Sequence, residues 1–360
     1  MDQEILTKIE AVVDAPTCYT ESERKPREVR LQELTDWYNK YNDVNVCYNL
    51  YGMDRVETTN LDQWLDRGIF LKQRHDVNAT YYPEGSAFPY DYTLFMRDKQ
   101  SFEMLMRSIH GNTNAFCRSY GIFENGKLYS FSEDGGKKEI TADIFLKDFS
   151  EKNVVFKSTF GCSGTGVMVA MVQDNKIIYA SKVFTIKEFL DSLYNPRSNW
   201  LIQAFITQHP TMSKFNDTSV NTMRIVTFNT GKRVVITTAA LRFGKHGKLV
   251  DNGDMGGLFT GVNDNGTVRN DMFSFTEKKR YENPNAGLKI PFWNEAKELV
   301  ISTHERIPEL FTIGWDVAIT PEGPMIVVGN DGWDPNLSQT PVGYGLRIIW
   351  DKLVKERSEF

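Results

Sequence analysis

Short turns between apolar, β-branched segments recur along the chain from about residue 114, and they restrict its fold more than any other feature of the sequence. The clearest turn is Asn125-Gly126, because both central positions of a type I′ hairpin turn need a positive φ. Similar patterns predict a hairpin over VMVAMVQDNKIIYAS, a second that turns at residues 229–231 and a third that turns at residues 321–323. The chain beyond residue 114 is therefore expected to be rich in β-strands.

Helical periodicity is confined to a few segments that flank and separate these strands. Residues 21–43 are charge-rich, with apolar side chains mostly three or four positions apart, which predicts an amphipathic helix. Asp98 precedes a second such pattern and is expected to cap its N-terminus. Further helices are predicted in TADIFLKDF, TIKEFLDSL, PFWNEAKELVISTHERIP and GYGLRIIWDKLVKER. This order of elements predicts an α+β fold with regions at residues 1–98, 99–204 and 205–360.

Composition excludes several classes of protein. With 41% hydrophobic and 25% charged residues, the 360-residue chain has the composition of a globular protein. The 47 acidic residues outnumber the 42 basic ones, so the net charge of −5 predicts no general attraction for nucleic acid or anionic membranes, and an anionic ligand must be held locally. The four cysteines form no CxxC pair and no apolar run is long enough to span a membrane, which is typical of a cytoplasmic protein without a zinc site.

A lysine followed by a glycine-rich loop is the most distinctive local string. Lys157 ends a predicted strand, and the string that follows contains Gly161, Ser163, Gly164, Thr165 and Gly166. Glycines let backbone N–H groups approach phosphate oxygens closely, and the hydroxyl and ammonium groups add donors. The string is not a Walker A loop, because Val167 follows the last glycine. A nucleotide phosphate suits this loop, and a plain glycine-rich turn is the alternative.

Two oxygen-bearing side chains lie on the arms of the last predicted hairpin. Asp316 and Asn330 are spaced so that both can face the same side, and Asp331 and Asp334 follow closely. Hard oxygen ligands on adjacent strands are how proteins hold Mg²⁺, which also uses the phosphates of its substrate. The alternative is that these are strand-end acids in contact with solvent.

Arginines occur in strands that otherwise have the pattern of a core. Arg224, with Asn221 just before it, and Arg242 lie on the two arms of one predicted hairpin. A buried arginine is costly unless it is paired, so each one either forms an internal salt bridge or grips a phosphate or carboxylate. Nucleophile chemistry is not indicated, because the histidines are scattered, and His304 is expected to be an ordinary residue on a helix surface.

Taken in order, these parts resemble the ATP-grasp superfamily, and most closely its sugar-transfer-associated group. The resemblance extends from about Lys99 to Asp334 and lies in the order of the parts. It implies an ATP-grasp fold in which the nucleotide is held between a lid at residues 99–204 and a catalytic region at residues 205–360. Residues 1–98, expected to form an α/β region, match the family only weakly, and whether they recognise the acceptor is left open.

The resemblance also implies a role for each part of the site. The loop at residues 161–166 would close over the phosphates, the strand at residues 203–206 would meet adenine, and ATP and Mg²⁺ would be the cofactors. The residues implied for the nucleotide are Lys99, Lys157, Gly161, Ser163, Gly164, Thr165, Gly166, Gln203, Phe205 and Ile206. Asp316 and Asn330 would hold Mg²⁺, and Arg242, Arg224 and Asn221 would neutralise the transition state.

The implied activity is that of an ATP- and Mg²⁺-dependent carboxylate–amine ligase that acts through an acyl phosphate. Its substrates would be small or sugar-linked carboxylates and amines of a surface polysaccharide such as a capsule, with glycosyltransferases as partners. One departure from the family matters, because Val328 stands where a metal-binding glutamate is usual. Either Asp331 or another acid replaces that glutamate, or one metal ion suffices, or the protein is a catalytically degenerate ATP-binding module. A sugar phosphotransferase that uses the same parts is a further alternative.

Overall fold

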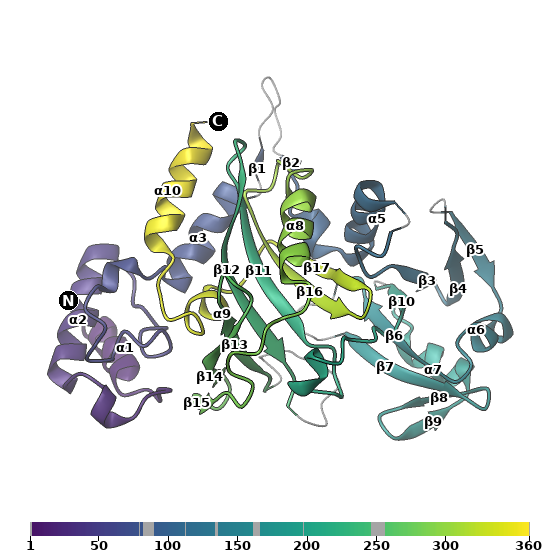
Figure 1. Cartoon of the computed structure of the whole chain (residues 1–360), viewed down its shortest axis with the longest axis horizontal. Helices are drawn as coiled ribbons and strands as arrows, with labels where there is room; N and C mark the ends of the chain where they lie inside the picture. Colours follow the sequence, from purple (N-terminus) through teal and green to yellow (C-terminus); the bar gives the residue numbers. More distant parts are fainter. Residues whose placement is uncertain are drawn as a thin grey trace.

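The computed structural model describes residues 2–78, 80–81, 90–111, 113–133, 136–160, 166–196, 198–245 and 256–359. Three regions follow one another across the molecule: N-terminal helices, a central sheet with helices packed on it, and a second sheet at the opposite end (Figure 1). Helices and antiparallel sheets are both present, so the predicted α+β class is confirmed. Within the described ranges, no helix combines the length and the apolar character needed to cross a membrane.

The N-terminal region is helical. It contains α1 (Gln3–Val13), η1 (Glu21–Glu23), α2 (Arg27–Tyr41), η2 (Leu61–Gln63) and α3 (Arg67–Asn78). The helix predicted within residues 21–43 is α2, which follows Pro26 and ends at Asn42 with a φ of 51°. Leu34 and Trp37 of α2 pack against α1 in a hydrophobic cluster of their own. Helix α3 was not predicted from the sequence.

A short hairpin and two helices connect this region to the sheets. They are β1 (Thr80–Tyr81), β2 (Tyr90–Asp91), α4 (Leu94–Arg97) and α5 (Lys99–His110). Asp98 caps α5 as predicted, because its carboxylate accepts a hydrogen bond from the backbone N–H of Ser101 at 2.6 Å. Phe102 and Met106 of α5 lie in the core of the central sheet. The boundaries predicted for the three regions of the sequence stay predictions.

The second sheet, which we call the lid sheet, has eight strands in the order β5-β4-β3-β10-β6-β7-β8-β9. Its strands are β3 (Ser119–Glu124), β4 (Lys127–Phe131), β5 (Lys137–Ile140), β6 (Lys152–Ser158), β7 (Val167–Gln173), β8 (Lys176–Tyr179), β9 (Lys182–Phe184) and β10 (Trp200–Ala204). Asn125 and Gly126 have φ values of 51° and 78°, which confirms the predicted turn between β3 and β4. On one face α6 (Ala142–Asp148) and α7 (Ile186–Leu193) bring Phe145 and Phe189 against Phe156 of β6.

The central sheet has seven strands in the order β15-β14-β13-β12-β11-β16-β17. Its strands are β11 (Thr222–Asn229), β12 (Val234–Phe243), β13 (Leu258–Val262), β14 (Val268–Ser274), β15 (Lys279–Glu282), β16 (Thr312–Thr320) and β17 (Gly323–Asn330), and η3 (Met212–Lys214) precedes them. The two hairpins predicted here, β11–β12 and β16–β17, are confirmed.

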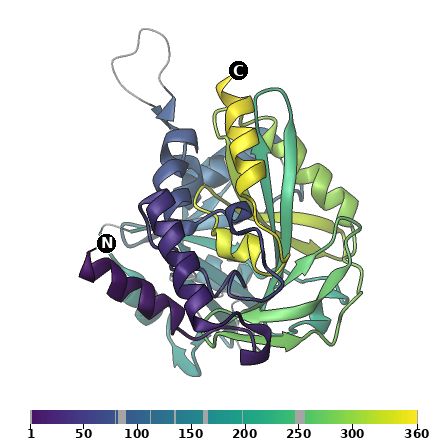
Figure 2. The ribbon, with the colours of Figure 1, turned by 90° about the vertical axis from the view of Figure 1, so that its left-hand side faces the viewer.

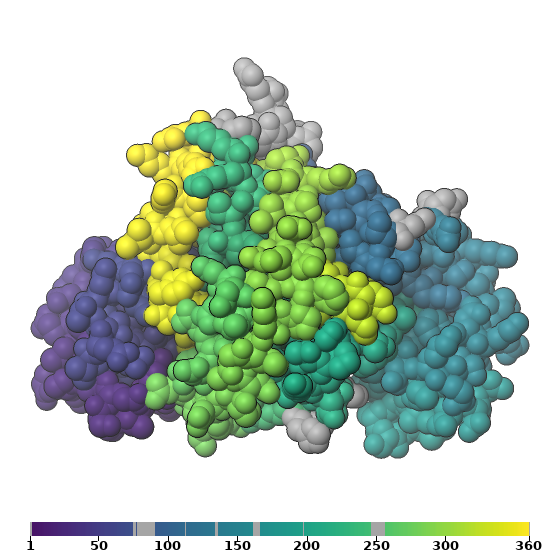
Figure 3. Space-filling model, viewed as in Figure 1, coloured from purple at the N-terminus to yellow at the C-terminus, as the bar shows by residue number. Residues whose placement is uncertain are grey.

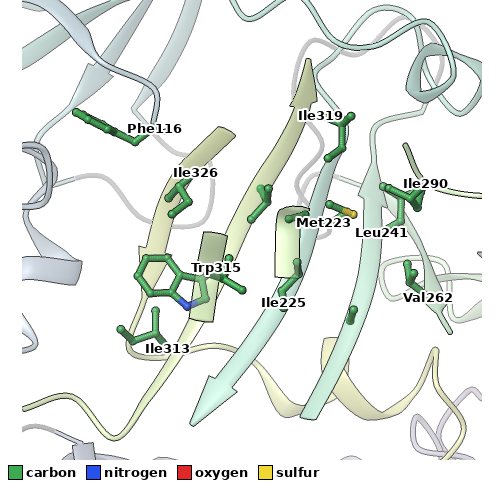
Figure 4. Packing of buried hydrophobic residues seen from close by; sticks show 14 of the residues in the cluster. Phe116, Met223, Ile225, Leu241, Val262, Ile290, Ile313, Trp315, Ile319 and Ile326 are labelled. Atoms are coloured by element: carbon green, nitrogen blue, oxygen red, sulfur yellow. The ribbon is translucent and has the colours of Figure 1, made fainter. Parts of the chain in front are cut away.

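Side chains on β11 alternate between the two faces of the central sheet. Met223 and Ile225 lie in the core together with Trp315 of β16, under α8 (Trp293–His304) (Figure 4). Val226 and Phe228 face the other side, where they cluster with aromatic side chains of α3 and α10 (Arg347–Ser358). Figure 2 shows α10 beside the N-terminal helices, and α9 (Pro335–Gln339) leads towards it from β17. The alternation places Arg224, between Ile225 and Met223, on the same face as Val226.

The two sheets are joined at the edge strand β17. The backbone N–H of Cys117 donates to the Ile326 carbonyl at 2.8 Å, and the N–H of Ile326 donates to the Ala115 carbonyl at 2.8 Å. The segment just before β3 thus runs parallel to β17 and extends its hydrogen bonding. These hydrogen bonds attach the start of the lid sheet to the edge of the central sheet.

The expectation that His304 lies on a helix surface is wrong. His304 is fully buried, its Nδ1 lies 2.7 Å from Thr227 Oγ1, and its Nε2 lies 2.9 Å from the Leu310 carbonyl oxygen. Because a carbonyl only accepts hydrogen bonds, Nε2 carries a hydrogen. Burial lowers the pKa of His304 to about 4. The side chain is therefore a structural link between α8 and β11.

Candidate functional site

A cleft of about 780 Å³ lies between the lid sheet and the central sheet. The lid forms the body coloured in teal in Figure 3, beside the green body of the central sheet. Successive side chains of a strand point to opposite faces of its sheet. In each sheet, alternate side chains therefore pack into a core and the others form a wall of the cleft. The residues that line it from the two sheets include Val155, Lys157, Val167, Val169, Leu201, Gln203, Thr222, Arg224, Arg242, Asp316, Val328 and Asn330.

Among its described residues, the wall formed by the lid sheet is apolar apart from Lys157 and Gln203. Val154 and Phe156 of β6 belong to the core under α6 and α7, so Val155 and Lys157 face the cleft. Val167 and Val169 do the same on β7. This wall offers an apolar surface with one positive charge, that of Lys157, near its end.

Gln203 lies near the end of strand β10 at the edge of this wall, and its side chain is held in place by hydrogen bonds. Its Nε2 donates to the Cys117 carbonyl and to Ser119 Oγ, each at 3.2 Å. The pairing of β10 with β6 ends at Ala204, and Phe205 and Ile206 continue along the cleft. The structure therefore brings Gln203, Phe205 and Ile206 to the cleft next to Lys157.

Lys99 reaches the cleft from the first turn of α5. Its backbone N–H donates to the Thr159 carbonyl at 3.1 Å, which ties the start of α5 to the end of β6. The two predicted phosphate lysines, Lys99 and Lys157, thus line one cleft although they are far apart in sequence. Gly166 closes the glycine loop with a φ of 77°, and its carbonyl accepts from the Ser158 N–H at 2.7 Å. The predicted residues Gly161, Ser163, Gly164 and Thr165 lie outside the described residues.

The opposite wall is centred on one carboxylate held by two arginines. Nε of Arg224 lies 2.6 Å from Asp316 Oδ1, and Nη1 of Arg242 lies 3.0 Å from both oxygens of the same carboxylate. Burial alone raises the pKa of such an acid, but the two adjacent guanidinium groups outweigh it and hold the pKa of Asp316 below its usual value. Asp316 is therefore ionised, and this wall carries more positive than negative charge.

Asn330 and Asp331 complete this wall at the end of β17. Nδ2 of Asn330 lies 3.1 Å from the Gly314 carbonyl oxygen and 3.4 Å from Asp316 Oδ2. Asp331 accepts a hydrogen bond at 2.7 Å from Nη2 of Arg97, which belongs to α4. The predicted convergence of Asp316 and Asn330 is thus present in the structure, with Asp331 turned towards Arg97.

A family comparison agrees with this arrangement. The model described as sugar-transfer associated ATP-grasp matches residues 77–353. The chain belongs to this family. The ATP-grasp fold expected from the sequence is thereby confirmed. A comparison with curated proteins found no match.

Solved structures of ATP-grasp ligases are similar at low identity. A D-alanine–D-alanine ligase from Bacillus anthracis is 11% identical, with a TM-score of 0.39 over 90% of this chain and 82% of that chain. The VanG D-Ala:D-Ser ligase from Enterococcus faecalis is 13% identical, with a TM-score of 0.42 over 73% of this chain and 62% of that chain. The assignment to the sugar-transfer associated ATP-grasp family rests on the sequence match over residues 77–353.

The residues of this ATP-grasp protein do not fit a resident magnesium site as they are arranged. Both oxygens of Asp316 are hydrogen-bonded to arginines, and its partner in the β16–β17 ladder is Val328 instead of an acid. In the described part of the chain, no group of three histidine, cysteine or acidic side chains is placed to hold a metal ion. An arginine-bound carboxylate attracts anions more than cations. The assignment of Asp316 and Asn330 as metal ligands stays a prediction.

Asn221 is not brought to the cleft. Its Nδ2 lies 2.7 Å from the Met212 carbonyl oxygen and 2.8 Å from that of Asn216, and it also contacts Gln208. The side chain is fully buried and holds the loop before β11 in shape. Its predicted role at the transition state has no support in its position.

Three arginines of the cleft were missed in the sequence. Arg67 and Arg74 belong to α3, and Arg97 belongs to α4. For the two arginines of α3, the sequence did contain a signal. Arg67, Phe70 and Arg74 are three and four positions apart, a spacing that places these three side chains on one side of a helix. No helix was predicted between residues 43 and 98, so these arginines were not recognised as residues of the site.

Proposed function

We propose that this protein binds ATP between its two sheets and uses it to activate a carboxylate for attack by an amine. The observation that carries the proposal is that Lys99 and Lys157 on one side and Arg224 and Arg242 on the other line a single cleft. Phosphoryl transfer needs positioning and positive charge more than covalent help from the protein. A cleft with basic groups on both walls supplies both.

The cleft divides into two functional parts. Adenine lies against the apolar wall at Val155 and Val169, with the backbone at residues 204–206 beside it, and Lys99 and Lys157 hold the phosphates. Arg242 faces the γ-phosphate and stabilises the negative charge that spreads over its oxygens in the transition state. Arg224 and Asp316 act as positioning residues, since they fix the guanidinium of Arg242.

The reaction takes place in two displacements. A carboxylate oxygen of the first substrate attacks the γ-phosphorus of ATP, ADP leaves, and an acyl phosphate forms. The nitrogen of the amine then attacks the acyl carbon, loses a proton, and inorganic phosphate leaves with the C–O bond electrons. Mg²⁺ would be held mainly by the phosphates of ATP and would neutralise part of their charge, because the side chains around Asp316 offer it no site of their own as they are arranged.

The acceptor is a carboxylate or amine of a surface polysaccharide precursor, modified in the cytoplasm. The support for this class is the description of the family as associated with sugar transfer. Amidation of a uronic acid and attachment of an amino acid are both consistent with this chemistry. Glycosyltransferases that build the same polymer are the partners we propose.

A second function is favoured by the arginine-bound state of Asp316 and by Val328 opposite it. Without a second acid on β17, the protein would bind ATP as a sensor or scaffold without turnover. A phosphotransferase that places a sugar hydroxyl at the γ-phosphate is a third use of the same cleft.

The proposal is tested in two steps with the full chain. Mg·ATP at millimolar concentration should raise the melting temperature, because a ligand of the native state stabilises it. ADP release is then measured with mixtures of uronic acids and amines, with Arg242→Gln as the inactive comparison. No shift in melting temperature would remove ATP binding altogether. A shift without ADP release from any mixture would favour the binding module, and ADP release with a neutral sugar alone would favour the phosphotransferase.

A further inference from the structure

The cleft has a second basic end that the match to the ATP-grasp family does not include. Arg67 and Arg74 line the cleft from α3 and precede residue 77, where the family match begins. Arg97 of α4 lines the same end. None of the three has a part in holding ATP in the function proposed above.

The orientation of α3 is set by aromatic packing. Phe70 is fully buried, with its ring centroid 4.7 Å from that of Trp333 and 5.5 Å from that of Trp350. Because residues 67 and 74 each lie about one helical turn from Phe70, one before it and one after it, the packing of Phe70 also fixes their direction. Both guanidinium groups are thereby held towards the cleft.

Arg74 lies directly against the backbone of the segment after β17. A Cβ atom added to Gly332 would be only 2.0 Å from Nη1 of Arg74. The guanidinium therefore occupies the space that a side chain at position 332 would take. Gly332 follows Asp331, so this charge is held next to the end of β17, where Asn330 faces the cleft.

Among the described residues that line this end of the cleft, the three arginines outnumber the two acids, Asp331 and Asp334. Asp331 pairs with Arg97 at 2.7 Å, and Asp334 lies 3.7 Å from Arg67. Asp91 is a further acid, 4.0 Å from Arg97. Among the residues that the structure describes, no carboxylate pairs with Arg74. The side chains of Arg67 and Arg97 remain 45% and 44% exposed, so a ligand can reach them.

We propose that Arg67, Arg74 and Arg97 bind an oxyanion of the acceptor molecule, a carboxylate or a phosphate, beside the site of phosphoryl transfer. This assignment rests on the proposed function, because it places the acceptor next to the γ-phosphate. Planar guanidinium groups bind both kinds of oxyanion in a bidentate manner. The N-terminal helices thus select an anionic acceptor, whether the anion is the carboxylate that reacts or a phosphate at another position of the same sugar.

The test measures anion binding by calorimetry on the full chain saturated with Mg²⁺ and a non-hydrolysable ATP analogue. The probes are inorganic phosphate, glucuronate, glucuronate 1-phosphate and the uncharged methyl ester of glucuronate. We expect saturable binding of at least one anion and none of the ester. Arg67→Gln and Arg74→Gln should each weaken that binding about 10- to 100-fold. Arg233→Gln is the matched control, because Arg233 is exposed and pairs with Glu356 away from the cleft.

A second variant separates placement from charge. Gly332→Ala puts a methyl group where the guanidinium of Arg74 lies, so it should weaken anion binding without removing a charge. A stronger effect on glucuronate than on phosphate identifies the carboxylate as the bound group, and the reverse identifies a phosphate. The proposal is overturned if no anion binds, or if the α3 variants bind as tightly as Arg233→Gln. Binding of the ATP analogue is measured first. If the analogue does not bind, the proposed function is contradicted, and the anion titration without the analogue still tests the arginine site.

Discussion

Arg224 of β11 and Asp316 of β16 lie directly opposite each other in the central sheet, and Nε of the arginine is 2.6 Å from Oδ1 of the acid. Both side chains are almost completely buried. Arg242 binds the same carboxylate from β12, so one acid fixes two arginines on the wall of the cleft. The central sheet thereby presents a rigid positive surface to the ligand.

Replacing Asp316 by asparagine should destabilise the protein. The change leaves two buried guanidinium groups without their counter-charge, and breaking a buried ion pair in this way costs about 3 to 5 kcal/mol. The free energy of unfolding in urea measures the loss. Asp351→Asn is the matched control, since its pair with Arg347 is on the surface and should change stability by less than about 1 kcal/mol. Equal losses in the free energy of unfolding for the two variants would show that the buried ion pair contributes no more to stability than the surface pair.

Lys157 should matter for ATP and not for the fold. Lys157→Gln removes a charge from the cleft, and the loss of a charged hydrogen bond to phosphate should raise the Kd for Mg·ATP about 10- to 100-fold. Lys152→Gln is the matched control, because Lys152 lies at the exposed start of the same strand β6. Calorimetric titration with Mg·ATP distinguishes them. Similar affinities for both variants would exclude Lys157 from the phosphate site.

Local signals in the sequence predicted the hairpins, and non-local contacts limited the rest. Asn125 and Gly126 need nothing beyond their own φ values to specify a turn, so that turn was predictable. The pairing of Arg224 with Asp316 depends on the register between β11 and β16, which are 92 residues apart at this point and are not joined by a hairpin. The alternatives stated for Arg224, an internal pair or a ligand site, could therefore not be separated.

Helix α3 escaped prediction for a related reason. Its arginines line the cleft on the same side of the helix as buried Phe70, so polar residues occur on its inner side and weaken the amphipathic pattern. His304 was misplaced because its buried partner Thr227 is 77 residues away. The burial and pairing of a residue are hardest to predict from a single sequence when its neighbours come from strands that are distant along the chain.

Introducing an acid at position 328 should create a metal site. Val328 is the ladder partner of Asp316 and lines the cleft, so Val328→Glu places a second carboxylate opposite the first. The affinity for Mg²⁺ in the presence of ATP should increase about tenfold, which corresponds to about 1.4 kcal/mol. Val328→Gln controls for size. Mn²⁺ titration followed by electron paramagnetic resonance measures the affinity, and equal affinity in the two variants would contradict the expectation.

Stability should fall in mild acid because of His304. Burial lowers the pKa of His304 to about 4 from the ordinary value of 6.5, so below pH 6.5 the unfolded chain takes up a proton that the native protein does not. The free energy of unfolding should therefore decrease as the pH falls from about 6.5 to about 4 and then level off. The decrease due to this group is about 3 kcal/mol. His304→Gln should remove that part of the slope, as measured by urea unfolding at a series of pH values. At pH 8 the ring is neutral in both states, so the difference there reports the altered packing and hydrogen bonds to Thr227 and Leu310. Parallel curves for the two proteins between pH 8 and pH 4 would show that His304 does not set the acid sensitivity.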